Sequence, residues 1–303
     1  MVVSALLLAL IAADPGVGTS GFDFIRIVPT AGEAAMGAAA LAKATSPMNF
    51  WYNPAHAAEN DGQRAHFGYI SYVAGIHVGS AAFSQRLEQD KGIGVGIVYL
   101  NSGSMKRTDE RGNELGTFGV SYADLNVSGG WELAEFVVVG AGVQGLYGSI
   151  DTFYTVGLAG NAAVKVNFPV NGLAGLNAAL VAQNLGLTVK PYNTQRDPMP
   201  MSFGAGIGYD INEAVRFGLD VVKPLDNRLQ FSAGVEGWIG EVLALRAGYN
   251  SLGPDLKSGG GTDILAGLST GLGVRYRGYQ LDYCFTPMVQ LGMAHRLSLA
   301  LTL

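Results

Sequence analysis

The sequence predicts an all-β protein: a transmembrane antiparallel barrel of about 14 strands with a small N-terminal helical plug, or hatch, in its lumen. Charged residues make up only 14% of the 303 residues, well below the roughly 25% of soluble domains, while hydrophobic residues reach 49%. After residue 13, however, no apolar run approaches the ~18 residues of a membrane-spanning helix. From Ala65 onward the hydrophobic pattern has a period of two, which is typical of strands. A hydrophobic chain without hydrophobic helices favours a membrane barrel.

The first residues predict export. Val2 to Ala13 is an apolar stretch that ends in small residues and is followed by a polar break, as in a signal peptide. No Lys or Arg stands near its start, which suggests a clipped N-terminus. The predicted organisation is therefore a signal peptide over residues 1–13, a plug or hatch segment over 14–62, and the transmembrane barrel over 63–303.

A short helix is expected early in the plug segment. Thr30 and Glu33 have the spacing of a capping box, and Ala31 to Ala42 is rich in alanine and free of β-branched residues. The sequence predicts a helix over this range. Because the range carries little apolar bulk, the helix needs a closely fitting partner such as a barrel lumen.

A second short helix is expected where the plug meets the first strand. Asn53 can cap free N–H groups and Pro54 suits the first helical turn, so Asn53-Pro54-Ala55 predicts the start of a short helix that ends near Glu59. Three aromatic residues stand directly before the cap. The alternative interpretation is an ordinary capped turn packed by aromatic side chains.

The rest of the chain divides into alternating segments separated by turn signals. Leu229, Phe231, Ala233 and Val235, for example, alternate with polar or small residues. Fourteen strands are predicted, near residues 65–74, 76–86, 92–104, 117–129, 136–148, 152–167, 174–190, 200–210, 214–223, 228–239, 242–250, 262–277, 278–286 and 294–303. An even number places both ends of the barrel on the periplasmic side, where the turns are short.

The predicted connections sort by length. Tight turns are expected at Asp210 to Glu213, Gly240-Glu241 and Arg277-Gly278. Long loops, which should face outward, are expected at Met105 to Gly116, Pro191 to Met199 and Ser251 to Gly261. Arg86 to Lys91 is an exception of middling length on the inner side.

Glycines also alternate within strands, at Gly92, Gly94 and Gly96 and again at Gly204, Gly206 and Gly208. If the aliphatic residues between them face lipid, these glycines face the lumen. There a missing side chain lets another backbone, such as the predicted helix, approach closely. Glycine would equally permit strong coiling at bends of the barrel, and the two explanations are compatible.

No catalytic set, metal site or cofactor site is predicted, and we expect no enzyme activity. The four histidines, His56, His66, His77 and His295, lack metal-ligand spacing. His295 and Ser298 fall on opposite faces of one strand and cannot form a dyad. Cys284 is expected in the lumen, where it would be inert. A net charge of −5 without a basic patch argues against nucleic acid as a partner.

Charged residues with luminal parity gather in the C-terminal half, and their mixed signs predict a structural network across the lumen rather than a substrate path. The members of this set are Arg216, Asp220, Arg228, Glu236, Arg246, Asp263, Arg275, Arg277, Asp282 and Arg296.

Several motifs resemble the PorV/PorQ family, relatives of the FadL-type fatty-acid transporters. They are Gly18 to Ile27, Ala31 to Gly37, Asn53-Pro54-Ala55, Arg107 to Glu110 followed by Gly112 and Gly116-Thr117-Phe118, and Gln183 to Gly186. The resemblance spans most of the chain. The sequence departs from the pattern at Gly32, where the family usually has arginine, and at the final Leu303, where an aromatic residue is usual.

The resemblance implies an outer-membrane location and a hatch that contains Asn53, Pro54 and Ala55. It further implies a non-enzymatic role in type IX secretion, in which the barrel binds the C-terminal signal domain of secreted cargo and delivers it to surface-processing proteins. Its outward loops would then be the contact surface. The alternative is a FadL-like transporter that carries long-chain fatty acids or other hydrophobic small molecules. A continuous apolar tunnel past the plug would favour that alternative.

Overall fold

The computed structural model describes residues 18–168, 175–253 and 261–303. The predicted signal peptide, residues 1–13, lies outside the described residues, as does most of the predicted loop from Ser251 to Gly261.

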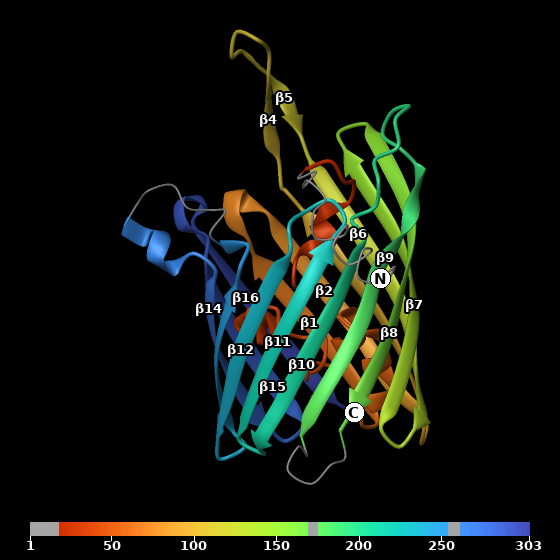
Figure 1. Ribbon diagram of the computed structural model, residues 1–303. Helices are drawn as coiled ribbons and strands as arrows, with labels where there is room; N and C mark the ends of the chain where they lie inside the picture. The colour runs from red at the N-terminus through yellow and green to blue at the C-terminus, as the bar shows by residue number, and fades with distance from the viewer. Residues whose placement is uncertain (1–17, 169–174, 254–260) are drawn as a thin grey trace, which may run out of the picture.

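Fourteen strands of the described chain form one closed antiparallel barrel (Figure 1), as predicted. They are β1 (Gln63–Ser71), β2 (His77–Glu88), β3 (Lys91–Asn101), β6 (Val120–Ala134), β7 (Val137–Ile150), β8 (Phe153–Asn167), β9 (Leu176–Lys190), β10 (Ser202–Asn212), β11 (Val215–Pro224), β12 (Gln230–Ile239), β13 (Leu243–Asn250), β14 (Leu268–Tyr276), β15 (Tyr279–Pro287) and β16 (Met293–Thr302). Each barrel strand pairs with the next barrel strand along the chain, and β1 closes the barrel against β16.

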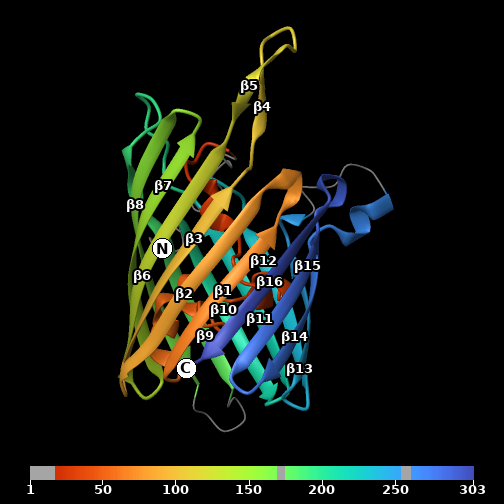
Figure 2. The ribbon, with the colours of Figure 1, turned by 180° about the vertical axis from the view of Figure 1, so that it is seen from behind.

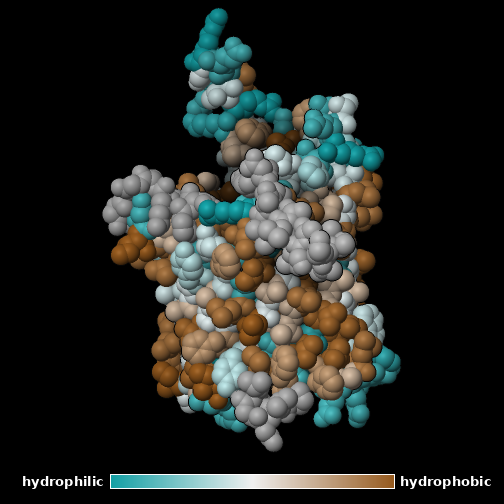
Figure 3. Space-filling model, in the orientation of Figure 1, coloured by the Kyte–Doolittle hydropathy of each residue, from teal (hydrophilic) through white to brown (hydrophobic). Residues whose placement is uncertain are grey.

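The barrel exterior is apolar. Side chains alternate between the two faces of each strand, and large hydrophobic residues such as Leu180 and Val143 are 66% and 65% exposed on the outside. Figure 3 shows hydrophobic residues over the visible wall. None of the helices in the described ranges has the length and apolar character needed to span a membrane. An apolar band around closed antiparallel strands is the surface that such barrels present to lipid.

The two ends of the barrel differ. At one end, the short-turn end, the barrel strands are joined by two or three residues, except for the longer connection between β8 and β9. Gln89 and Asp90 join β2 to β3, so the predicted middling connection from Arg86 to Lys91 is wrong because both strands extend into it. The other end, the long-loop end, carries a separate hairpin of β4 (Met105–Thr108) and β5 (Glu114–Phe118), which stands well above the barrel (Figures 1 and 2).

One predicted strand is shorter than expected. The strand predicted over residues 262–277 begins only at Leu268, because Gly261–Leu265 forms a 3-10 helix, η6, in the loop. Gly267 has a positive φ of 89°, and its carbonyl accepts a hydrogen bond of 2.8 Å from the N–H of Asn250. The pairing of β14 with β13 therefore begins only at Leu268, after this turn. Short 3-10 helices also lie in two other loops of the long-loop end, η4 (Val73–Gly75) and η7 (Val289–Leu291).

The N-terminal segment, residues 18–62 of the described chain, runs through the barrel lumen. It contains η1 (Asp23–Arg26), α2 (Ala31–Ala35), η2 (Asn49–Trp51) and η3 (Pro54–Glu59), and α2 contacts strands β13 to β16 whereas η3 contacts β2, β3 and β6 to β8. Much of its surface is covered, since Phe50, Ala55 and Ala57 are fully buried. Figure 2 shows its coils inside the wall.

The helix predicted over Ala31 to Ala42 is wrong in length, because α2 ends at Ala35. Gly37 and Ala38 have positive φ values of 67° and 71°, which end a right-handed helix. A Cβ on Gly37 would lie 2.5 Å from the carbonyl oxygen of Tyr249, so the chain turns there to follow the wall closely. The alanines after Ala35 therefore allow close packing against the wall and do not continue the helix.

The predicted capping box is also only half correct. Thr30 precedes α2, but its hydroxyl donates to the Glu33 carboxylate instead of accepting from the helix backbone. Oε1 of Glu33 accepts the N–H groups of Thr45 at 3.1 Å and Ser46 at 3.0 Å. Glu33 therefore ties the start of α2 to a later turn of the segment rather than capping the helix.

Candidate functional site

The N-terminal segment follows a track of luminal glycines around the inner wall. A Cβ added at any of these positions would contact or overlap the segment, so only glycine lets the two backbones approach so closely. From β14 back to β3, the main contacts are Gly271 with Ala35, Gly248 and Gly234 with Met36, Gly218 with Ala39, Gly206 with Leu41, Gly208 with Lys43, Gly140 with Ala55, Gly130 with Ala58, and Gly92 with Ala57. The predicted luminal position of Gly92, Gly94, Gly96, Gly204, Gly206 and Gly208 is thereby confirmed.

Asn53-Pro54-Ala55 starts the 3-10 helix η3, as predicted. Asn53 is fully buried, and its side-chain oxygen accepts the N–H of Ala55 at 2.9 Å. Its amide nitrogen donates to the carbonyl of Leu41 at 2.7 Å. The motif therefore fixes η3 and at the same time links it to an earlier turn of the N-terminal segment. A role of Asn53, Pro54 and Ala55 as a hatch stays a prediction.

A partly buried ion pair that the sequence analysis missed joins η3 to β8. Lys165 Nζ lies 2.6 Å from both oxygens of Glu59, and His56 Nδ1 lies 2.8 Å from Glu59 Oε2. Burial alone would raise the pKa of Glu59, but the hydrogen bond from His56 and the charge of Lys165 hold that pKa well below its usual range. The sequence could have indicated it, because Lys165 lies between Val164 and Val166, and in a strand whose valines face lipid the lysine must face the lumen.

The charge network predicted across the lumen instead runs along one side of the inner wall, on strands β10 to β15, and reaches the N-terminal segment at Lys43. Its links run from Lys43 to Asp210 at 2.8 Å, then to Arg216 at 2.7 Å, Glu236 at 3.1 Å, Arg246 at 2.6 Å and Asp282 at 2.7 Å. Asp220 instead accepts the N–H groups of Ala40 and Leu41 at 2.7 and 2.9 Å. The charged wall thus holds the N-terminal segment by both charge and backbone hydrogen bonds.

Three members of the predicted luminal set lie elsewhere. Arg277 occupies the exposed turn between β14 and β15 with a positive φ of 49°, since the strand ends at Tyr276. Asp263 belongs to η6 in a loop, and Arg228 is exposed at the long-loop end, where it donates to the carbonyl of Ser251. These three predictions were wrong because the alternation of faces was extended to residues that lie outside the observed strands. Arg296 is luminal and donates to the carbonyl of Val28 at 3.2 Å.

The described residues bring together no catalytic or metal-binding group. His295 is exposed and contacts the hydroxyl of Tyr283, while the buried Ser298 accepts the N–H of Ala31, so the predicted separation of the two residues is confirmed. Cys284 is buried and free, and within the described ranges no three His, Cys, Asp or Glu side chains are grouped to hold a metal.

Two cavities lie beside the N-terminal segment toward the long-loop end. One, of about 280 Å³, is lined mainly by apolar residues that include Val28, Tyr72, Leu252, Pro287 and Met288. The other, of about 180 Å³, mixes apolar and amide side chains, among them Leu41, Trp51, Gln144, Asn161, Gln183 and Asn184. Both can accept a small molecule with substantial apolar surface.

The wall next to the second cavity is irregular. Gly160 pairs with Leu185 and Ala162 with Ala182, so β9 has one more residue than β8 between these pairs. Asn184 adopts a positive φ of 58°, and its N–H donates to Asn161 at 2.8 Å. This β-bulge turns two consecutive residues, Gln183 and Asn184, toward the inner cavity.

An outer depression lies over the same part of the wall. It measures about 370 Å³ and is lined by residues of β8, β9 and β10 that include Ala162, Leu180, Ala182 and Phe203. The inner cavity and the outer depression therefore lie on opposite faces of one bulged strand pair.

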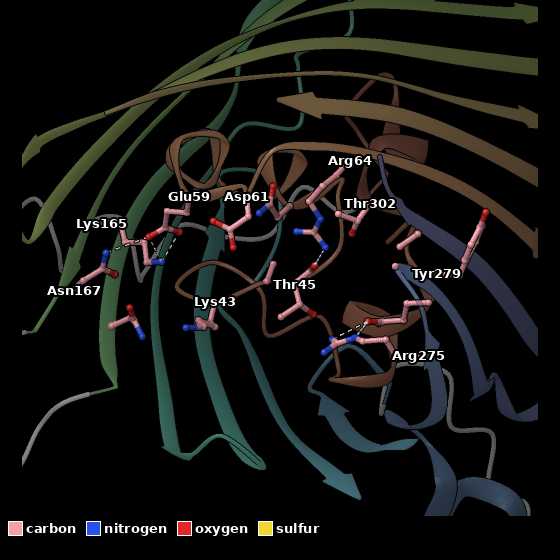
Figure 4. A pocket seen from close by; sticks show the side chains of 16 residues that line it. Lys43, Thr45, Glu59, Asp61, Arg64, Lys165, Asn167, Arg275, Tyr279 and Thr302 are labelled. Carbon is pink, nitrogen blue, oxygen red and sulfur yellow. Dashed lines mark hydrogen bonds and ion pairs between the residues drawn. The ribbon is translucent and has the colours of Figure 1, made fainter. Parts of the chain in front are cut away.

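The short-turn end holds a polar cavity of about 660 Å³, which we call the short-turn vestibule (Figure 4). Its charged lining residues are Lys43, Glu59, Asp61, Arg64, Lys165 and Arg275. The N-terminal segment forms one side of it, and the ends of β1, β8, β9 and β14 to β16 form the rest.

No family model matches the chain, and no curated protein matches it. Solved structures do match its fold. The toluene transporter TodX of Pseudomonas putida is 12% identical with a TM-score of 0.59, and the match covers 96% of this chain and 98% of that one. The toluene transporter TbuX of Ralstonia pickettii is 11% identical with a TM-score of 0.60 over 92% of this chain and 98% of that one.

A FadL homologue of Pseudomonas aeruginosa is 11% identical with a TM-score of 0.54, and the match covers 90% of this chain and 98% of that one. At such identities the likeness establishes the fold. The fold is that of FadL-like outer-membrane barrels, and together with the apolar exterior it identifies a bacterial outer-membrane protein. The short-turn end then faces the periplasm and the long-loop end the cell surface.

Proposed function

We propose that this barrel conducts small hydrophobic molecules across the outer membrane. The observation that carries the proposal is the bulged β8–β9 wall, which has a cavity on its inner face and a depression on its outer face. The fold it shares with proteins described as toluene transporters and hydrocarbon channels supports the same function. Fold likeness alone does not fix function, so the wall and its cavities are what must be tested.

The proposed route enters at the long-loop end and leaves sideways. A hydrophobic molecule would bind in the apolar cavity near Val28 and Tyr72, pass to the cavity beside Trp51, and leave through the bulge toward the depression at Ala162 and Ala182. A lateral exit delivers such a molecule to lipid and avoids the polar short-turn vestibule. The N-terminal segment acts in this proposal as a fixed floor beneath the route.

A reversible crosslink across the wall tests the route. Ala162 and Ala182 are direct partners, so cysteines at both positions have the Cα spacing that a disulfide requires. In a background with Cys284→Ser, the oxidised pair A162C/A182C should lower uptake of labelled toluene at least about fivefold, and reduction should restore it.

The matched control crosslinks two outward-facing partners in a regular part of the wall, V127C on β6 and V143C on β7. Oxidation of that pair should leave uptake unchanged. Uptake by the unmodified protein no greater than by a host without it would overturn the transport proposal. Equal effects of both crosslinks would overturn the lateral route.

The predicted secretion role gains no support from these comparisons, because the matched structures described by a role are toluene transporters and a hydrocarbon channel. The β4–β5 hairpin and the loops of the long-loop end are exposed as a cargo-binding surface would be, yet no described contact points to a protein partner. The transport proposal is therefore preferred.

A further inference from the structure

The short-turn vestibule has more positive than negative charge left over after its internal pairs are formed. Lys43 is neutralised by Asp210 at 2.8 Å, and Lys165 is neutralised by Glu59 at 2.6 Å. Two arginines and one aspartate remain among its charged lining residues. Nothing in the proposed hydrophobic route requires this surplus of positive charge.

Arg64, on β1, is oriented by neutral acceptors. Its Nη2 donates to the carbonyl of Thr45 at 2.8 Å, and its Nη1 contacts the side-chain oxygen of Asn60 at 3.4 Å. Among the described residues, Arg64 forms no ion pair with a carboxylate. The one acidic neighbour in the lining without a basic partner is the exposed Asp61. Arg64 is thus held in place without a carboxylate in direct contact, and the charges of Glu33 and Asp61 act on it only from a distance.

Arg275, at the end of β14, is held in a similar way. Its Nε and Nη2 donate to the side-chain oxygen of Gln280 at 3.2 and 2.9 Å. Its guanidinium carbon lies 4.1 Å from the ring centre of Trp238, a cation–π contact that fixes the plane of the group. Over the part of the chain that the structure describes, it too has no carboxylate partner. Figure 4 shows Arg64 and Arg275 entering the vestibule on either side of Thr45.

We propose that the short-turn vestibule is an oxyanion-binding site in which Arg64 and Arg275 bind a carboxylate or phosphate group from the periplasm. A planar guanidinium offers several N–H donors to the oxygens of such a group, and preorganised donors lose little freedom on binding. The site goes beyond the proposed transport and does not share its cavities, because the N-terminal segment separates the vestibule from the long-loop end. The bound group belongs either to a small free anion or to the head of an amphiphile.

Titration of the purified full chain in detergent at low salt tests the site. Inorganic phosphate should bind saturably, as measured by calorimetry and by a change in total tryptophan fluorescence, and binding should weaken as salt rises. Hexyl phosphate is the second probe: equal affinity for both probes indicates a free anion, and tighter binding of hexyl phosphate indicates an amphiphile head. Either result supports the oxyanion site.

The variants R64Q and R275Q should each weaken phosphate binding at least about tenfold. Arg275 is exposed, so R275Q leaves the fold intact even if R64Q does not. The matched control is R86Q, which removes the same charge at the same end of the barrel from an arginine that pairs with Glu132 outside the vestibule. R86Q should bind phosphate as the unmodified protein does.

Absence of saturable phosphate binding, or an equal loss in R86Q and R275Q, would overturn the proposal. The experiment needs no uptake measurement, so its failure is distinguishable from a failure of the transport proposal.

Discussion

Strands β10 to β15 line the lumen with paired charges, whereas β3, β6 and β7 line it mainly with glycine, aliphatic, serine and amide side chains, among which Asp124 is a buried charged residue. The N-terminal segment touches both sides. On the charged side, close packing against glycines such as Gly248 is combined with defined partners, such as Asp220 accepting from Ala40 and Leu41. On the small side it is held by fit, such as Ala55 against Gly140.

This difference indicates that two kinds of specificity position one segment. Ion pairs and hydrogen bonds fix the position of the N-terminal segment along the wall, because a shifted segment would leave a buried carboxylate without its partner. Close backbone packing fixes the distance between the segment and the wall, because a gap or an overlap the size of one methyl group is destabilising in a densely packed interior. Substitutions on the two sides should therefore destabilise the protein by different mechanisms and to different extents.

The largest effect is expected from Arg246→Met on the charged side. The Arg246 side chain is 1% exposed and lies between Glu236 at 2.6 Å and Asp282 at 2.7 Å. Its loss leaves the buried Asp282 without a cation and leaves Glu236 with Arg216 alone, at 3.1 Å. Breaking such a pair costs about 3–5 kcal/mol of unfolding free energy. Urea unfolding in detergent measures it.

Arg111→Met, at the exposed tip of the β4–β5 hairpin, removes the same charge and should change stability by less than about 0.5 kcal/mol. Adding Glu236→Gln and Asp282→Asn to Arg246→Met should recover part of the loss, because the uncompensated charges disappear. Equal stability of the two single variants would show that the network does not hold the charged side.

A smaller effect is expected from Gly140→Ala on the small side. The added Cβ would overlap the backbone at Ala55, and overpacking of this kind costs about 1–3 kcal/mol. Gly145 lies on the same strand with no atom within 4 Å of an added Cβ. Gly145→Ala should therefore be nearly neutral in the same urea unfolding experiment. If the two alanine variants unfold alike, close packing does not position the segment.

Much of the barrel was predictable from the sequence because strand alternation is a local property. Each strand needs only its own period of two to reveal its outer face, as the alternation from Leu229 to Val235 shows. Predicted strand boundaries were wrong where a loop forms structure of its own, as at Gly261–Leu265. Alternation shows which face a residue occupies but not where hydrogen bonding to the neighbouring strand begins. Luminal placement was consequently right for Arg246 and wrong for Arg277.

The N-terminal segment was less predictable because its conformation is set by the wall. The stretch after Ala35 has high helix propensity, yet contact with Tyr249 requires the positive φ of Gly37. The Glu33 carboxylate similarly accepts hydrogen bonds from the N–H groups of a turn that begins twelve residues later, and not from its own helix. Arg275 was predicted to face the lumen, but its grouping with Arg64 was not predicted, because the two arginines are far apart in the sequence and come to one cavity only when the barrel closes.

The smallest effect is expected where the segment enters the lumen, at Asp226 in the loop between β11 and β12. Arg26 Nη2 lies 2.5 Å from Asp226, and Ser20 donates to the same carboxylate. Burial would raise the pKa of Asp226, but the hydrogen bonds from Ser20 and Arg26 and the charge of Arg26 bring that pKa below its usual range. Asp226→Asn should cost about 1 kcal/mol or less at pH 7, because water screens the pair.

The pH dependence of this contribution follows from the sign of the shift. A carboxylate whose pKa is lower in the folded than in the unfolded state stabilises fully above the unfolded value of about 3.9 and loses that contribution as the pH falls through the folded value. The difference in thermal unfolding midpoint between the unmodified protein and Asp226→Asn should therefore be constant near neutrality and shrink below about pH 4. Glu110→Gln, which removes an exposed charge from the hairpin, should show no such convergence. A difference that persists unchanged below the folded pKa would mean that Asp226 acts through its shape rather than its charge. Entry of the segment would then depend on fit, as on the small side of the lumen.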